Sequence, residues 1–162
     1  MLRIMEATRL EAEQQIDAAI AVYEALYDEN SGDVVAANNL ASLIGTYVED
    51  PEALERAAAI ARRLREREVP AFQDTYGWIE YRRGNYSDAL ASLEPAATGL
   101  PDDPLVQFHL GMTYVALDRL QEARDALTRA LEIAGDNPLP QFDTARETLD
   151  GLPAAGEAPA EQ

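Results

Sequence analysis

The side chains that could do chemistry are few, and their spacing does not form a catalytic or metal-binding set. His109 is the only histidine and the chain has no cysteine. A serine–histidine pair could therefore use only His109, and the residues for a histidine-rich or thiolate metal site are absent from the sequence. The sequence also lacks a glycine-rich phosphate loop, an HExxH motif and EF-hand spacing. We therefore expect no catalytic residue, no metal and no cofactor, and we predict that the protein is not an enzyme.

Two acidic residues and the histidine have simpler explanations than chemistry. Asp102 and Asp103 directly precede Pro104, and an aspartate before a proline in the first turn is typical of a helix N-terminus. A helix cap therefore explains the pair better than a metal site does. His109 lies next to the apolar Leu110, so we interpret it as a surface or groove-edge residue.

The charge of the chain excludes some classes of partner. Its net charge is −17, so it repels nucleic-acid phosphates and anionic lipid, although it would attract a basic partner segment. Acidity is also a common means of staying in solution. The one basic cluster, in residues 56–67, alternates with glutamates. This pattern favours a solvated helix face with ion pairs over a binding patch.

The first residues and the apolar stretches bear on the compartment. Residues 1–14 carry charges throughout, which is unlike a signal peptide. Residues 34–48 are uncharged but contain asparagine, serine and threonine, and the stretch is too short to span a bilayer. We expect no nucleic-acid binding and no membrane insertion, and both a cytoplasmic and a periplasmic location remain open.

The elements that must position any site repeat along the chain at nearly constant spacing. Small residues recur at intervals of 34, 36 and 34 in two parallel columns. Two further columns of mainly apolar side chains keep the same intervals, which predicts structural repeats. The two small-residue columns are Ala7, Ala41, Gly77 and Gly111, and Ala19, Ala53, Ala89 and Ala123.

Each repeat unit is predicted to be a pair of helices. In the last unit, apolar residues follow a spacing of 3–4 residues on both sides of a turn near Asp118. Gly84 and Asn85 separate the two helices of the third unit, because both residues tolerate left-handed backbone. Small residues would allow the helices of a pair to cross closely, and we expect Gly77 to face Ala89 and Gly111 to face Ala123.

The pattern resembles the tetratricopeptide repeat family over about residues 1–137. The segments that carry the resemblance are Tyr76-Gly77-Trp78 through Asp88-Ala89-Leu90 to Pro101, and Leu110-Gly111 through Glu122-Ala123 to Ala130. The third unit is also similar to tetratricopeptide proteins of bacterial envelope and polysaccharide-export systems. Glu80 and Glu6 depart from the family pattern, and the second unit has two extra residues, placed in its second helix or in the loop before Pro70.

The resemblance implies an all-α, right-handed superhelical solenoid of about four helix-turn-helix repeats plus a C-terminal capping helix. The expected units are about 1–33, 34–69, 70–103 and 104–137. A capping helix is expected at 138–149, followed by a disordered tail at 150–162, which lacks apolar periodicity. The N-terminal face begins with Leu2, Ile4 and Met5 without a polar cap, which suggests a larger repeat protein, a first helix that frays, or a homodimer through that face.

In this family the first helix of each unit lines a concave groove, and this geometry selects the candidate site. The candidates grade from polar through aromatic to apolar along the chain, and we expect a protein or peptide partner with apolar anchors. They lie outside the core columns, so we expect folding not to require them, although packing between neighbouring helices is an alternative. The candidate residues are Asn38, Ser42, Asp74, Trp78, Tyr81, Arg82, Leu105, Phe108, Met112 and Val115.

Within this set, Arg82 is expected at the rim, where it would pair with an acidic group of the partner. The sequence thus predicts a protein–protein interaction scaffold that binds a partner segment in its concave groove. The alternative is a structural role, as an oligomerisation or spacer segment of a larger multi-repeat protein.

Overall fold

The computed structural model describes residues 2–153, and in this range the chain forms nine α-helices and no strand. The predicted all-α helical repeat solenoid is therefore confirmed. The helices are α1 (Leu2–Ala12), α2 (Ile16–Glu29), α3 (Val34–Tyr47), α4 (Pro51–Arg65), α5 (Pro70–Arg82), α6 (Tyr86–Gly99), α7 (Pro104–Ala116), α8 (Leu120–Ala134) and α9 (Pro140–Gly151).

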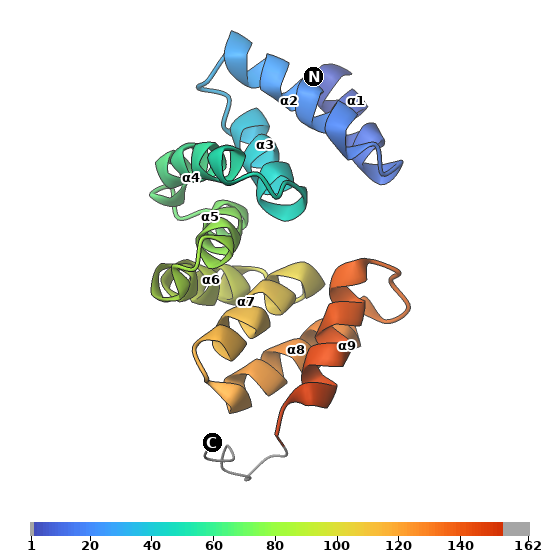
Figure 1. Cartoon of the computed structure of the whole chain (residues 1–162). Helices are drawn as coiled ribbons and strands as arrows, with labels where there is room; N and C mark the ends of the chain where they lie inside the picture. Colours follow the sequence, from blue (N-terminus) through green and yellow to red (C-terminus); the bar gives the residue numbers. More distant parts are fainter. Residues whose placement is uncertain (1, 154–162) are drawn as a thin grey trace.

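The first eight helices form four hairpins that stack side by side along the chain (Figure 1). Within the stack, α3 contacts α5, α5 contacts α7, and α7 contacts α9, so the first helices of successive hairpins form a continuous inner wall. The stack curves, and α1 and α9 lie at its two ends on the same side (Figure 1). None of the nine described helices is long and apolar enough to cross a membrane.

Acidic caps and prolines fix where several helices begin. The Asp103 carboxylate accepts hydrogen bonds from the backbone N–H groups of Leu105 and Val106 at 2.9 and 3.2 Å. Asp33 and Asp50 cap α3 and α4 in the same way. These side chains satisfy N–H groups that have no partner inside the helix. The interpretation of Asp103 as a helix cap is confirmed.

Close helix crossings depend on the glycines of the repeat columns. A Cβ atom on Gly77 would lie 2.6 Å from Leu93 Cγ and 3.1 Å from the Ala89 carbonyl oxygen. A Cβ atom on Gly111 would lie 2.7 Å from Leu127 Cγ and 3.2 Å from the Leu127 backbone nitrogen. The atoms nearest to Gly111 thus belong to Leu127, one helical turn after the predicted Ala123, whereas Gly77 lies against the predicted Ala89 as well as Leu93.

Replacing Gly111 with alanine should lower the free energy of unfolding by about 1–3 kcal/mol through overpacking. The loss is expected although alanine is the better helix former by about 1 kcal/mol, since Leu127 is fully buried and cannot move aside. Chemical unfolding followed by circular dichroism measures the change. Gly151→Ala is the matched control, because no atom of the described residues lies within 4 Å of its added Cβ. Equal stability of both variants would contradict this account of the crossing.

The place of the two extra residues in the second unit differs from the sequence expectation. The extra length of the second unit is shared by its two helices, since α3 and α4 have 14 and 15 residues whereas α5 and α6 have 13 and 14. The expected site, α4 or the loop before Pro70, is therefore only half correct. At the N-terminus, Leu2 and Met5 are exposed on α1.

The last helix extends beyond its expected end at residue 149, because α9 runs to Gly151. The side chain of Leu152 packs against the buried cluster of α6, α7 and α8, and the Arg124 guanidinium donates to the backbone carbonyls of Leu152 and Pro153. These contacts place the first residues of the expected tail in the fold. Residues 154–162 of the predicted disordered tail lie outside the described residues.

Candidate functional site

The inner wall of the stack encloses a hollow, which we call the concave cavity. It consists of a larger part of about 390 Å³ and a smaller part of about 220 Å³. The two parts adjoin, because Thr46, Tyr47, His109 and Gln141 line both of them. The lining comes from α3, α5, α7 and α9, with Glu11 of α1 and Gln14 of the following turn closing the N-terminal side.

A stack of aromatic rings forms the wall of the larger part. The Trp78 ring lies between the rings of Tyr81 and His109, with centroid distances of 4.7 and 4.2 Å and interplanar angles of 8° and 17°. The Phe108 ring is tilted against Trp78 at 5.8 Å. Four aromatic side chains from α5 and α7 thus hold one another in place, which gives the cavity a rigid apolar surface.

A buried hydrogen bond orients His109 within this stack. His109 is buried, and its Nδ1 atom lies 2.8 Å from the Asp74 carboxylate. Of the two predicted positions for His109, the surface position is wrong because the residue is buried, whereas the groove-edge position agrees with its place in the lining of the concave cavity. Its ring is held by Asp74 of α5 on one edge and by Trp78 on one face, so the imidazole joins the first helices of two units.

The smaller part of the cavity is acidic. Glu11, Asp74 and Asp103 line it, and among the described residues no arginine lines either part of the cavity. Burial raises the pKa of the Glu11 carboxyl above its usual range. A cation placed beside Glu11 would favour its charged form and offset the cost of burial. The arrangement therefore suits an apolar group beside Trp78 and a positively charged group beside the carboxylates.

The structure brings together six of the ten groove residues predicted from the sequence. Ser42, Asp74, Trp78, Leu105, Phe108 and Met112 line the concave cavity. Tyr81 stacks on the ring of Trp78, and Val115 packs against buried apolar clusters of the two C-terminal units. Asn38 lies on α3 and does not line the cavity.

Phe108 and Met112 do not form an open apolar surface, because α9 packs over them. Phe108 is only 3% exposed and belongs to a buried cluster with Leu127 of α8 and Ala145 of α9. The Met112 sulfur lies 3.8 Å from the Thr148 hydroxyl of α9. The expectation that folding does not require Phe108 is wrong, since its ring is part of the core beneath the capping helix.

Arg82 is not available at the rim for a partner, in contrast to the expectation from the sequence. Its guanidinium donates to the backbone carbonyls of Gly45 and Val48 at 2.8 and 3.3 Å and pairs with the Glu49 carboxylate at 3.0 Å. The last carbonyl groups of a helix lack partners within the helix and carry partial negative charge. Arg82 satisfies those of α3, and it thereby ties the second unit to the third.

Replacing Arg82 with glutamine should therefore lower the free energy of unfolding by about 1.5–3 kcal/mol, because hydrogen bonds from a charged group to α3 are lost. The control is Arg146→Gln, since Arg146 is exposed and its ion pair joins it to Asp143 of its own helix. That change should cost at most about 0.5 kcal/mol. A urea titration of both variants measures the difference, and equal midpoints would show that Arg82 does not hold the two units together.

Several cavity residues were missed by sequence reasoning. Tyr47 lies five residues after Ser42, one position off the helical stripe that Asn38 and Ser42 define, and Gln14 lies in the first interhelix turn. Pro140, Gln141 and Thr144 belong to the helix expected only to cap the stack. Family geometry assigns the groove to the first helices of the units, so it carries no signal for a turn or a capping helix that bends over the groove.

In the described part of the chain, histidine, aspartate and glutamate side chains form no group of three or more that could hold a metal ion. Over the described range of the chain, three buried side-chain polar atoms have no hydrogen-bond partner. Two of them belong to residues that line the cavity: the Trp78 Nε1 atom and the Gln141 side-chain oxygen. Such unsatisfied groups are uncommon in folded proteins. One is a donor and the other an acceptor, and both are buried atoms of side chains that line the concave cavity.

Comparison with known proteins supports the repeat architecture. The family model described as tetratricopeptide repeat matches residues 77–138. A search of curated protein sequences gives no match.

Solved structures share the fold over nearly the whole chain. MamA from Desulfovibrio magneticus RS-1 is 14% identical, with 92% of this chain and 90% of that chain covered and a TM-score of 0.60. TTC0263, a thermophilic TPR protein of Thermus thermophilus, is 21% identical, with coverages of 91% and 97% and a TM-score of 0.58. YrrB, described as a TPR protein with an unusual peptide-binding site, is 16% identical, with coverages of 90% and 90% and a TM-score of 0.54.

Proposed function

We propose that this chain, which matches the tetratricopeptide repeat model over residues 77–138 and shares the fold of such proteins, is an interaction scaffold whose concave cavity binds a segment of a partner protein. The observation that carries the proposal is the cavity itself. Its larger part is walled by Trp78, Phe108 and Met112 and measures about 390 Å³. A hollow of this size with aromatic walls and a few polar groups is typical of binding sites.

The chemistry of the lining defines the partner segment. An apolar side chain would contact Trp78 in the larger part, and a lysine or arginine would lie near Glu11 and Asp74 in the smaller part. The net charge of −17 adds long-range attraction for a basic segment. The Trp78 N–H is buried and has no hydrogen-bond partner among the described residues, so an acceptor of the partner that reached it would satisfy it.

The fold relatives are consistent with this proposal. One of them, YrrB, is described as having an unusual peptide-binding site, and another relative is described as a CopN–Scc3 complex. Peptide or protein binding is thus a use to which this fold has been put. The alternative role, a spacer in a larger multi-repeat protein, requires no ligand in the cavity.

A random peptide library displayed on phage tests the proposal, because selection requires no named partner. The full chain should select peptides in which an aromatic or aliphatic residue lies close to a lysine or arginine. Selected peptides should bind more weakly at higher salt, because the acidic part of the cavity contributes to their affinity. A library that yields no enriched sequence would favour the spacer role, and one that yields only acidic sequences would contradict binding of a basic segment in the cavity.

A further inference from the structure

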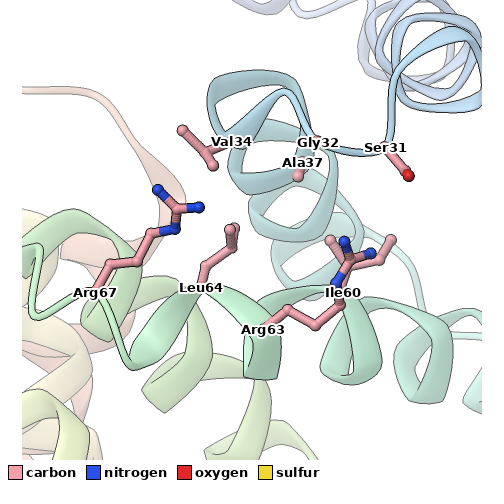
Figure 2. Close-up of a pocket in the computed structure, with 8 residues that line it drawn as sticks. All are labelled: Ser31, Gly32, Val34, Ala37, Ile60, Arg63, Leu64 and Arg67. Atoms are coloured by element: carbon pink, nitrogen blue, oxygen red, sulfur yellow. The ribbon is translucent and has the colours of Figure 1, made fainter.

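A second hollow lies at the other end of α3, away from the concave cavity. It has a volume of about 60 Å³ and lies between the α2–α3 loop, the first turn of α3 and the last turns of α4 (Figure 2). Its floor is apolar, with Val34, Ala37 and Leu64, and two arginines at the end of α4 stand at its edge. We call it the arginine pocket. The concave cavity instead begins at Ser42 of the same helix.

The arginines of the pocket are Arg63, in the last turn of α4, and Arg67, in the turn that follows the helix. Figure 2 shows that both guanidinium groups extend toward the side on which α3 lies, with Leu64 between them. The pocket therefore presents two positive charges beside an apolar floor.

The two arginines are not paired with the glutamates that lie near them in the sequence. Glu24 pairs with Arg56 and Glu55 pairs with Arg83, whereas Glu66 and Glu68 flank Arg67 and form no ion pair among the described residues. Arg63 donates one hydrogen bond to the Tyr27 hydroxyl at 2.8 Å, and over residues 2–153 neither Arg63 nor Arg67 forms an ion pair. The expected ladder of ion pairs with interleaved glutamates is thus wrong at this end of α4, although carboxylates outnumber basic groups by 30 to 13.

We propose that the arginine pocket docks an acidic segment of a partner protein, with an aliphatic side chain on the apolar floor and carboxylates on Arg63 and Arg67. Guanidinium groups bind carboxylates through paired, charge-assisted hydrogen bonds. The floor formed by Val34, Ala37 and Leu64 favours a protein segment over a simple anion. The net charge of −17 disfavours a nucleic acid, whose many phosphates would meet the rest of the surface.

This site is independent of the concave cavity, because the two hollows share no lining residue among those described. They use opposite ends of α3, so both can be occupied at once. A basic segment in the cavity and an acidic segment in the pocket would allow the chain to bring two chemically different segments together.

Binding of a short fluorescein-labelled peptide of alternating glutamate and leucine, followed by fluorescence anisotropy on the full chain, tests the proposal. We expect saturable binding that weakens as salt is raised, and no binding of the glutamine–leucine or lysine–leucine analogue. Arg67→Glu should weaken binding about tenfold or more. The control Arg129→Glu changes the charge equally on α8, far from the pocket in sequence, and should leave the affinity within about twofold.

Arg67→Glu avoids the hydrogen bond that Arg63 makes with Tyr27, so a loss of binding cannot be ascribed to misfolding if the circular dichroism melt is unchanged. Equal binding by the parent and Arg67→Glu, or equal binding of the glutamine–leucine analogue, would overturn the proposal. Tighter binding of a single-stranded oligonucleotide would overturn it in favour of a phosphate ligand. A dimer in sedimentation that becomes monomeric in Arg67→Glu would overturn it by assigning the pocket to a second copy of the chain.

Discussion

Replacing Phe108 with alanine should lower the free energy of unfolding by about 3–5 kcal/mol, the cost of removing a buried aromatic ring from a core. Phe108 is 3% exposed and packs between Leu127 of α8 and Ala145 of α9. The vacated space cannot close easily, because Trp78 on its other side is itself fixed between two rings. Urea unfolding monitored by circular dichroism measures the loss.

Phe108→Leu is the matched control, since it keeps an apolar side chain in the same place and should cost less than the alanine change. The expectation is specific to the packing of α9 over α7. An unchanged midpoint for Phe108→Ala would show that α9 does not cover this residue in solution, and that the larger part of the cavity is more open than described.

Replacing Trp78 with alanine should reduce the affinity for a library-selected peptide by about 30-fold or more, corresponding to about 2 kcal/mol. Trp78 presents its ring to the cavity and is held in place by Tyr81 and His109. A partner side chain therefore meets a rigid aromatic surface, and little side-chain entropy is lost on binding. Isothermal titration calorimetry of parent and variant measures the difference.

A variant that removes no packing separates binding from stability. Thr144→Arg places a long cationic side chain at the cavity from an exposed position of α9, so it should block a basic segment sterically and by charge repulsion. Thr128→Arg makes the same change at an exposed position of α8 that does not line the cavity. Equal affinity of these two variants for the peptide would place the binding site elsewhere.

The repeat architecture could be predicted from the sequence because it depends on local patterns. Small residues at a constant interval mark helix crossings, and Asp103 before Pro104 marks a helix start whose geometry the structure confirms. The partner of Gly111 could not be predicted to better than one turn. Ala123 and Leu127 lie on the same face of α8, and only the tilt of the two helices decides which of them meets the glycine.

The candidate site could be predicted only in part. Periodicity shows which residues share a helix face, but it does not show which other element covers that face. Trp78 and Met112 line the cavity as expected. Phe108 shares the stripe of α7 with Met112, yet α9 folds back over it from 30 or more positions along the chain. The packing of α9 over α7 depends on tertiary contacts, which the spacing of residues along α7 does not predict.

Arg82 illustrates the same limit for a charged residue. Its position at the end of α5 suggested a rim residue that awaits an acidic partner. The carbonyl groups that it satisfies belong to the end of α3 and its cap, 34 to 37 positions earlier. An unpaired charge in a sequence can therefore be a structural cap of a neighbouring unit, and only the packed structure distinguishes the two roles.

The central claim is that the concave cavity holds a partner segment against Trp78, and this residue offers a direct measurement. It is the only tryptophan of the chain, so intrinsic fluorescence and a single indole N–H resonance report on the cavity alone. Titration with a library-selected peptide should shift the emission and move the indole cross-peak, because the N–H gains an acceptor that it lacks among the described residues. Both signals should follow the binding isotherm, and Thr144→Arg should suppress them. Saturable peptide binding that leaves both Trp78 signals unchanged would contradict the claim.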